Sequence, residues 1–209
     1  MLAVYLTNCL NKRHFKTGMT FEKILKNIKN HVSLTAAESK YFTGLLQTHA
    51  VDKGEILLTA GQPCEYFYFV NDGVLRAYHL SPKGKESTLM FAMADWWITD
   101  MASFVKQAPA LIYIEAVEAG EILRLHKQDM DLLLDQHPKF EKCFRVLFQN
   151  AYIREQVRSI ENLTLTAEER YDRFVGKYPE LCSKITQKQI ASYLGITPEF
   201  LSAIRAQKR

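Results

Sequence analysis

Apolar and polar positions follow three successive patterns along this 209-residue chain. Residues 21–31 and 35–47 carry apolar side chains at helical spacing, and Thr35 and Glu38 have the spacing of a capping box. Between residues 49 and 126 short apolar runs alternate with turn residues, and helical spacing then returns. The pattern predicts an α+β protein whose β-rich middle lies between helical ends.

The β-rich middle consists of short runs bounded by turn signals. Turns are predicted at residues 71–73 and 81–84, and strands at 55–59, 66–70, 74–80, 87–92, 111–117 and 121–125. Many short strands at this spacing predict an antiparallel, jelly-roll-like β-roll. A small roll either encloses a ligand or is filled by its own side chains, and the sequence fits both alternatives.

A long helix follows the predicted roll. After a helix at residues 127–136, Pro138 stands at a helix start, and apolar spacing continues to about residue 162. A helix of about 24 residues spans roughly 36 Å, which is longer than one small roll covers. We therefore predict a dimer contact along Phe140, Phe144, Leu147 and Ala151, with a hinge at residues 161–165; the alternative is that this stripe packs only on its own roll.

The last segment has the pattern of a helix-turn-helix. Residues 166–177 form its preceding helix, with Thr166 and Glu169 at capping-box spacing. Ala191 supplies a small helix contact, Gly195 a residue that tolerates positive φ, and Pro198 the first position of a second helix. The predicted inward positions are Ile190, Leu194, Ile196, Leu201 and Ile204. An ordinary helical hairpin that packs on a core is the alternative interpretation.

Formal charge is concentrated in the same segment. Residues 182–209 contain one acid, Glu199, and five basic residues, namely Lys184, Lys188, Arg205, Lys208 and Arg209. Their net charge of +4 equals that of the whole chain, so the formal charges of residues 1–181 sum to zero. Basic charge gathered on one segment favours binding to phosphates.

Composition narrows the protein class. No run approaches the eighteen or so apolar residues of a membrane span. The apolar start precedes its basic residues, which is the reverse of a secretory signal. The four cysteines are far apart without a C-x-x-C pair, which indicates reduced thiols in the cytoplasm. We predict four segments: a disordered or mis-started stretch (1–18), the roll with flanking helices (19–137), the long helix and hinge (138–163) and the helix-turn-helix domain (164–209).

Catalytic chemistry has no support in the sequence. The histidines at 49, 79, 126 and 137 lack H-x-H or H-x-x-x-H spacing, so a metal-dependent cupin enzyme, the main enzymatic alternative for a small roll, lacks its ligands. No G-x-S-x-G motif or local Cys/His signature indicates a nucleophile. We expect no catalytic residues, no metal and no cofactor.

The order of these parts resembles the Crp/Fnr family of bacterial transcription regulators. The resemblance covers about residues 35–209 and includes Lys53-Gly-Glu-x-Leu, Gly61, Tyr68-Phe-Val-x-x-Gly-Val and the helix-turn-helix. It implies a cyclic-nucleotide-type sensor roll, a dimer seam on the long helix and recognition helices that enter successive major grooves. The compact C-terminus, without room for a wing hairpin, looks like the branch common in Bacteroidetes-type bacteria.

The resemblance fails where a cyclic nucleotide would bind. Binders in this family carry a Gly-Glu pair for the ribose and an Arg followed by Ser or Thr for the phosphate. Here the corresponding stretch contains Thr99 and Asp100, and the phosphate position falls near Ala110 and Leu111. A buried phosphate without its arginine is costly, which argues against ordinary cAMP binding. Asp100 could accept from a ligand hydroxyl, and Trp96 and Tyr113 could line an apolar pocket, although core packing explains both aromatic residues equally well.

DNA contacts carry over from the family only at matching positions. Thr186, Gln187 and Lys188 begin the first helix of the motif and correspond to phosphate contacts, joined by Arg205 further along. The base-reading positions correspond to Pro198, Glu199, Ser202 and Ala203. Glu199 can accept from a cytosine amine, whereas Ala203 stands where many relatives have a guanine-reading arginine.

Two functions follow as hypotheses. The first is a homodimeric, cytoplasmic regulator that binds double-stranded DNA and RNA polymerase, with an unknown small-molecule effector or none, and no membrane association. The second is a small-molecule or cyclic-nucleotide binding module whose helix-turn-helix mediates protein contacts. A metalloenzyme is a distant third.

Overall fold

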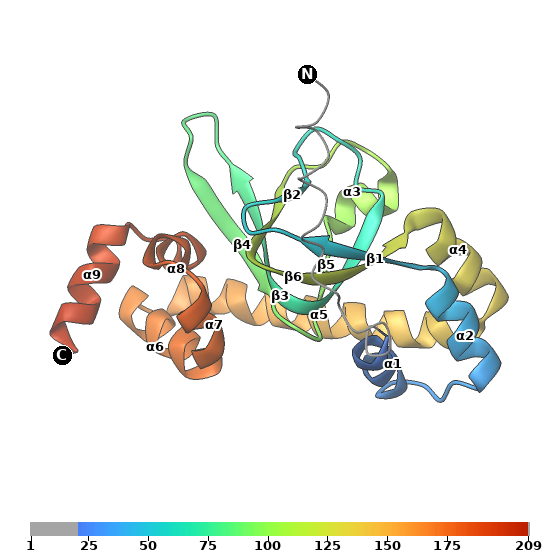
Figure 1. The fold of residues 1–209 in the computed structure, drawn as a ribbon. Coiled ribbons are helices and arrows are strands. Elements are labelled where there is room, and N and C mark those ends of the chain that lie inside the picture. The colour runs from blue at the N-terminus through green and yellow to red at the C-terminus, as the bar shows by residue number, and fades with distance from the viewer. Residues whose placement is uncertain (1–20, 209) are drawn as a thin grey trace, which may run out of the picture.

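The computed structural model describes residues 21–208, and the predicted disorder of residues 1–18 lies outside this range (Figure 1). Two helices, α1 (Glu22–Lys29) and α2 (Ala36–Gly44), precede the sheet. The strands and the helix among them are β1 (Leu46–Val51), β2 (Ile56–Leu58), β3 (Tyr66–Leu80), β4 (Glu86–Ala92), β5 (Trp97–Ile98), α3 (Met101–Lys106) and β6 (Tyr113–His126). The C-terminal helices are α4 (Lys127–Gln136), α5 (Pro138–Thr164), α6 (Ala167–Lys177), α7 (Pro179–Lys184), α8 (Gln187–Leu194) and α9 (Pro198–Gln207).

The described strands form one antiparallel sheet that curls into a roll. Its order is β1-β6-β3-β4, with β2 paired to β6 and β5 paired to β3. The long strands β3 and β6 pair along most of their length and form its centre. Apolar side chains from both strands fill the interior together with residues from α1, α2, α4 and α5. The predicted antiparallel roll is therefore confirmed.

The predicted turn at residues 71–73 is wrong, because β3 continues through it. The register between β3 and β6 shifts there instead, as in a β-bulge. Gly73 has φ of 89°, which glycine adopts without a steric penalty. Across the pair, a Cβ on Gly120 would lie 2.2 Å from the Asp72 carbonyl oxygen, so this approach needs glycine. The predicted strands 66–70 and 74–80 are thus one bulged strand, as are 111–117 and 121–125.

The helices largely follow their local signals. The Thr35 hydroxyl accepts from the Glu38 N–H and the Glu38 carboxylate accepts from the Thr35 N–H, which confirms that capping box. Thr166 and Glu169 form the same arrangement at α6. Helix α5 extends to Thr164, so residues 161–164 are its last turn, and only Leu165 of the predicted hinge lies outside the helix. Elements β1, β5, α3 and α7 were not predicted.

The C-terminal helices pack on the roll as well as on one another. Figure 1 shows α5 running along the roll to a helical cluster of α6–α9 at one end. A second buried cluster joins Val74, Phe91 and Val117 of the roll to apolar residues of that helical domain. Phe91 and Tyr193 are in ring contact, with centroids 5.8 Å apart. The helical domain is therefore docked on the roll through a shared apolar core.

Candidate nucleic-acid interface and effector cavity

Helices α8 and α9 form the predicted helix-turn-helix. Thr186 caps α8, Gly195 ends it with φ of 71°, and Thr197 caps α9 by accepting from the Phe200 N–H. The N–H of Ile196 donates to the Ala191 carbonyl and closes the turn. Of the predicted inward residues, Ile196 is half-buried and the other four are buried, namely Ile190, Leu194, Leu201 and Ile204.

The predicted base-reading residues lie together on the exposed side of α9. Pro198, Glu199, Ser202 and Ala203 are all exposed, while Leu201 and Ile204 face the helical core. The Ser202 hydroxyl donates to the Pro198 carbonyl and keeps its lone pairs available as acceptors. This face is therefore free to contact a partner. Pro198 and Glu199 lie at the N-terminus of α9, which is the end that contacts base edges in a recognition helix.

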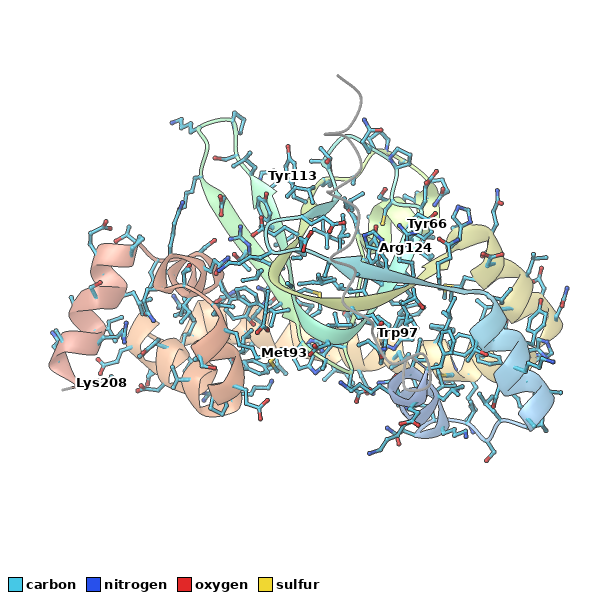
Figure 2. The ribbon with its side chains drawn as sticks, viewed as in Figure 1. Tyr66, Met93, Trp97, Tyr113, Arg124 and Lys208 are labelled. Atoms are coloured by element: carbon cyan, nitrogen blue, oxygen red, sulfur yellow. The ribbon has the colours of Figure 1, made fainter. Side chains whose placement is uncertain are left out.

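The basic residues of this end fall into two groups. Lys184 pairs with Glu118 of the roll at 2.8 Å, which raises the pKa of Lys184. Lys208, at the far end of the chain in Figure 2, pairs with Asp172 and Glu168 of α6, and its hydrogen bond to Asp172 raises the pKa of Lys208. Part of the predicted basic excess is thus neutralised within the protein.

Lys188 and Arg205 form the other group, because neither has an ion-pair partner within residues 21–208. Lys188 is exposed in the first turn of α8, between Gln187 and Gln189. Exposed Thr186 is the α8 cap, and Gln187 is half-buried. The described basic residues of the C-terminal segment that have no ion pair therefore lie on α8 and α9.

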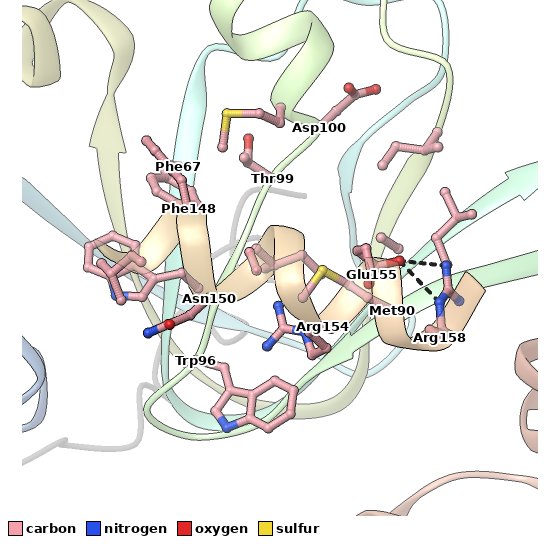
Figure 3. A pocket seen from close by; sticks show the side chains of 18 of the residues that line it. Phe67, Met90, Trp96, Thr99, Asp100, Phe148, Asn150, Arg154, Glu155 and Arg158 are labelled. Carbon is pink, nitrogen blue, oxygen red and sulfur yellow. Dashed lines mark hydrogen bonds and ion pairs between the residues drawn. The ribbon is translucent and has the colours of Figure 1, made fainter. Parts of the chain in front are cut away.

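A cavity of about 550 Å³ opens between the roll and α5 (Figure 3). Its wall is mainly apolar and includes Phe67, Met90 and Phe148. Helix α5 contributes Arg154 and the ion pair between Glu155 and Arg158, whose atoms are 2.8 Å apart. A cavity of this size accommodates a small organic molecule.

The cavity contains four of the six predicted effector residues. Thr99, Asp100, Leu111 and Trp96 line it. Ala110 is instead buried, and Tyr113 stacks on Tyr78 with ring centroids 5.3 Å apart, so neither residue lines this cavity. Sequence reasoning missed the contributions of α5, because they depend on where the long helix crosses the roll.

Asp100 differs from the expectation in its chemistry. It caps α3, and its two carboxylate oxygens accept from the N–H groups of Ser103 and Leu111, each at 3.1 Å. The side chain is buried. Asp100 thus shapes the loop that borders the cavity and already has hydrogen-bond partners without a ligand. The described cavity wall also contains no arginine from the roll, since both of its arginines come from α5.

The predicted dimer stripe on α5 faces its own roll. Phe140 and Phe144 are fully buried in the roll core, and Leu147 packs against it. Leu147 and Ala151 also line the cavity. A partner subunit cannot reach Phe140 or Phe144, so their assignment to the dimer contact is wrong, and the alternative that this stripe packs on its own roll holds for them. The stripe fixes the helix to the roll.

A polar network connects α8 to the roll. The Ser192 hydroxyl of α8 accepts from the Thr88 N–H at 2.9 Å and donates to the Glu86 carbonyl at 2.9 Å. Buried Arg76 of β3 forms ion pairs with Glu86 of β4 and Glu115 of β6, and so links the start of β4 to the rest of the sheet. Strand β4 therefore carries the α8 contact, and its Leu89 and Met90 also line the cavity.

Residues 21–208 contain no cluster of three or more histidine, cysteine or acidic residues arranged to hold a metal ion. Burial raises the pKa of the Cys143 thiol to about 12, which disfavours the reactive thiolate. No helix among these residues is both long and apolar enough to cross a bilayer.

The chain is similar in sequence to known proteins. Residues 48–137 match the family profile of the cyclic nucleotide-binding domain. The chain also resembles the "Anaerobic regulatory protein" of Pasteurella multocida, with 24% identity over 171 residues that cover 76% of this chain and 62% of that protein. The chain thus spans less than two thirds of this relative's length.

Solved structures extend the likeness to the helical domain. The c-di-GMP-responsive global regulator CLP of Xanthomonas campestris has a TM-score of 0.70 at 11% identity, covering 83% of this chain and 91% of that one. A protein of Eubacterium rectale assigned to the Crp/Fnr family of transcriptional regulators has a TM-score of 0.67 at 21% identity, covering 82% of each chain.

The chain therefore has a cyclic nucleotide-binding-type domain followed by a helical domain, and it shares this fold with the two solved structures. Its resemblance to the Crp/Fnr family is confirmed by the domain match and by the fold. The Bacteroidetes-type branch stays a prediction.

Proposed function

We propose that this protein is a non-enzymatic, homodimeric transcription regulator that reads double-stranded DNA with α9. The observation that carries the proposal is the exposed face of Pro198, Glu199, Ser202 and Ala203. Lys188 and Arg205 accompany it and have no ion-pair partner among the described residues. Base edges and phosphates are the partners that such a combination suits. A regulator of this kind acts in the cytoplasm, where it meets DNA and RNA polymerase.

Dimerisation would use a second stripe of α5. Val146, Asn150, Ile153, Val157 and Ile160 follow the alternating spacing of four and three residues found in coiled coils. Ile153 and Ile160 are each more than half exposed, at 55% and 53%. Pairing along this stripe would bury them and leave the roll-facing stripe in place. Asn150 would set the register of the two helices.

An effector would act through the cavity between the roll and α5. Strand β4 lines this cavity with Leu89 and Met90 and holds α8 through Glu86 and Thr88. A ligand that binds one position of β4 more tightly shifts the population of α8 orientations. The lack of a roll arginine in the cavity favours an effector other than cAMP.

The proposal is tested by replacing Lys188 and Arg205 with alanine. Each lost phosphate contact should lower the salt dependence of DNA affinity by about one unit of the log–log slope. Fluorescence anisotropy of a labelled duplex at several salt concentrations measures this slope. Lys142→Ala with Arg145→Ala removes the same charge from the exposed side of α5 and should leave the slope unchanged. Equal effects of the two double variants would contradict the proposal.

The protein-interaction alternative rests on Phe200, which is 52% exposed on α9. Under that alternative the Lys188 and Arg205 substitutions leave function intact. Phe200→Ala would then abolish partner binding.

A further inference from the structure

The hairpin that joins β3 to β4 projects from the roll on the side of the helical domain (Figure 1). The Gly84 N–H donates to the Ser81 carbonyl, and the Ser81 N–H donates to the Lys85 carbonyl, each at 2.9 Å. Pro82 at the second turn position and Gly84, with φ of 76°, suit this tight turn. The turn is therefore closed by its own hydrogen bonds and holds Lys83 and Lys85 at its tip.

The tip carries basic charge without a counter-charge. Lys83 and Lys85 are exposed, and neither has an ion-pair partner within residues 21–208. The acid nearest in sequence, Glu86, already pairs with buried Arg76 at 2.9 Å. The two ammonium groups are therefore available to an anion outside the protein.

The hairpin is attached to the helix-turn-helix directly beside this tip. The Glu86 carbonyl, one residue after Lys85, accepts from the Ser192 hydroxyl of α8 at 2.9 Å. Lys188 precedes Ser192 by four residues, so the two side chains lie on the same side of α8. Lys85 and Lys188 therefore flank one contact between the hairpin and α8, and they belong to one continuous basic surface.

The DNA backbone is the partner that suits this surface. A duplex carries one negative charge for about every 1.7 Å of its axis, so it can pair with several separated lysines at once, whereas a small anion pairs with one. An acidic protein has the same sign of charge. The position beside Lys188 favours DNA, because a duplex read by α9 contacts phosphates at the start of α8.

We propose that the β3–β4 hairpin is a second DNA-binding element, whose Lys83 and Lys85 contact backbone phosphates next to those bound by α8. The inference rests on the proposed function, since it requires a duplex on the helix-turn-helix. The hairpin leads into β4, which lines the effector cavity. The roll thus contributes to DNA affinity directly, and a shift of β4 relative to α8 changes the number of phosphates that the protein contacts.

The proposal is tested with Lys83→Ala combined with Lys85→Ala in the full-length protein. Fluorescence anisotropy of a labelled duplex of mixed sequence, at several salt concentrations, gives the salt dependence of DNA affinity. The log–log slope should fall by about one unit for each lysine lost. Because phosphate contacts carry no sequence information, duplexes of different sequence should show the same loss. Lys83→Gln with Lys85→Gln removes the same charge with longer side chains and should reproduce the result.

The matched control is Lys26→Ala with Lys29→Ala, which removes two exposed lysines from α1, away from the helical domain (Figure 1). It should leave the slope unchanged. An unchanged slope in both hairpin variants would overturn this proposal alone. Equal losses in the hairpin and α1 variants would also overturn it, because they would indicate attraction by net charge. Failure of the wild type to bind any duplex would overturn the proposed function as well.

Discussion

At the residue scale, the features that could be predicted from the sequence are those set by near neighbours. The capping boxes at Thr35 and Thr166 and the left-handed Gly195 need only a few residues of local chain, and all three are confirmed. The role of Asp100 could not be predicted, because its second partner, the N–H of Leu111, reaches it only through folding. The Asp100 carboxylate, which the sequence suggested as a ligand contact, therefore stabilises the loop beside the cavity.

Glu38 gives a prediction at this scale for the pH dependence of stability. Hydrogen bonds from the Thr35 backbone, followed by the contact with Lys139, lower the pKa of Glu38 from 4.5 to about 2. A lowered pKa stabilises the fold above the unfolded value, and that contribution is lost as the pH falls through the folded value. Wild type should therefore melt above Glu38→Gln at pH 7, and the difference should shrink between pH 4.5 and about 2.

Thermal unfolding monitored by circular dichroism at pH 7, 4 and 2.5 measures this difference. The control is Glu141→Gln, since exposed Glu141 has no ion-pair partner within residues 21–208. A difference between wild type and Glu38→Gln that stayed constant across the pH range would contradict the assigned role of the carboxylate.

At the element scale, the type of each segment could be predicted more readily than its continuity. Asn71-Asp72-Gly73 has the composition of a turn, yet β3 passes through it as a bulge, because pairing with β6 continues on both sides. Helix α5 was recognised from its spacing, but its length carries two apolar stripes. Periodicity alone did not show which stripe the roll would cover, since that depends on the angle at which the helix crosses the sheet.

The exposed stripe of α5 yields a prediction for assembly. Ile153→Glu together with Ile160→Glu should convert a dimer to a monomer, because pairing would bury four like charges in an apolar seam. Sedimentation velocity over a range of protein concentrations measures the change. Leu132→Glu replaces a leucine on α4 that is 49% exposed, and it should leave the dimer intact. A double variant that remains dimeric would place the interface elsewhere.

At the scale of the whole molecule, the roll and the helix-turn-helix domain behave as one packed unit in this arrangement. Their contact combines the apolar cluster of Val74, Phe91 and Val117 with the hydrogen bonds of Ser192. This contact was not predicted, because its members are about one hundred residues apart in sequence. Through this contact, β4 touches both the cavity and α8 directly.

Ser192→Ala tests this contact. The substitution leaves the buried Thr88 N–H without its acceptor, which should cost about 1–3 kcal/mol of stability. Urea unfolding measures the loss. Ser183→Ala on exposed α7 removes only a hydroxyl bonded to its own helix, and it should change stability by about 0.5 kcal/mol or less. Equal effects of the two substitutions would show that the Ser192 bonds do not hold the domains together.

The most direct measurement of the central claim is selection of bound sequences from a random duplex pool by the purified full-length protein at physiological salt. A homodimer that reads DNA with α9 should enrich a palindrome whose half-sites lie about 10 base pairs apart, one turn of the double helix. Retention without enrichment would show phosphate attraction without base reading. No retention even at low salt would contradict the account and favour the helix-turn-helix as a protein-interaction surface.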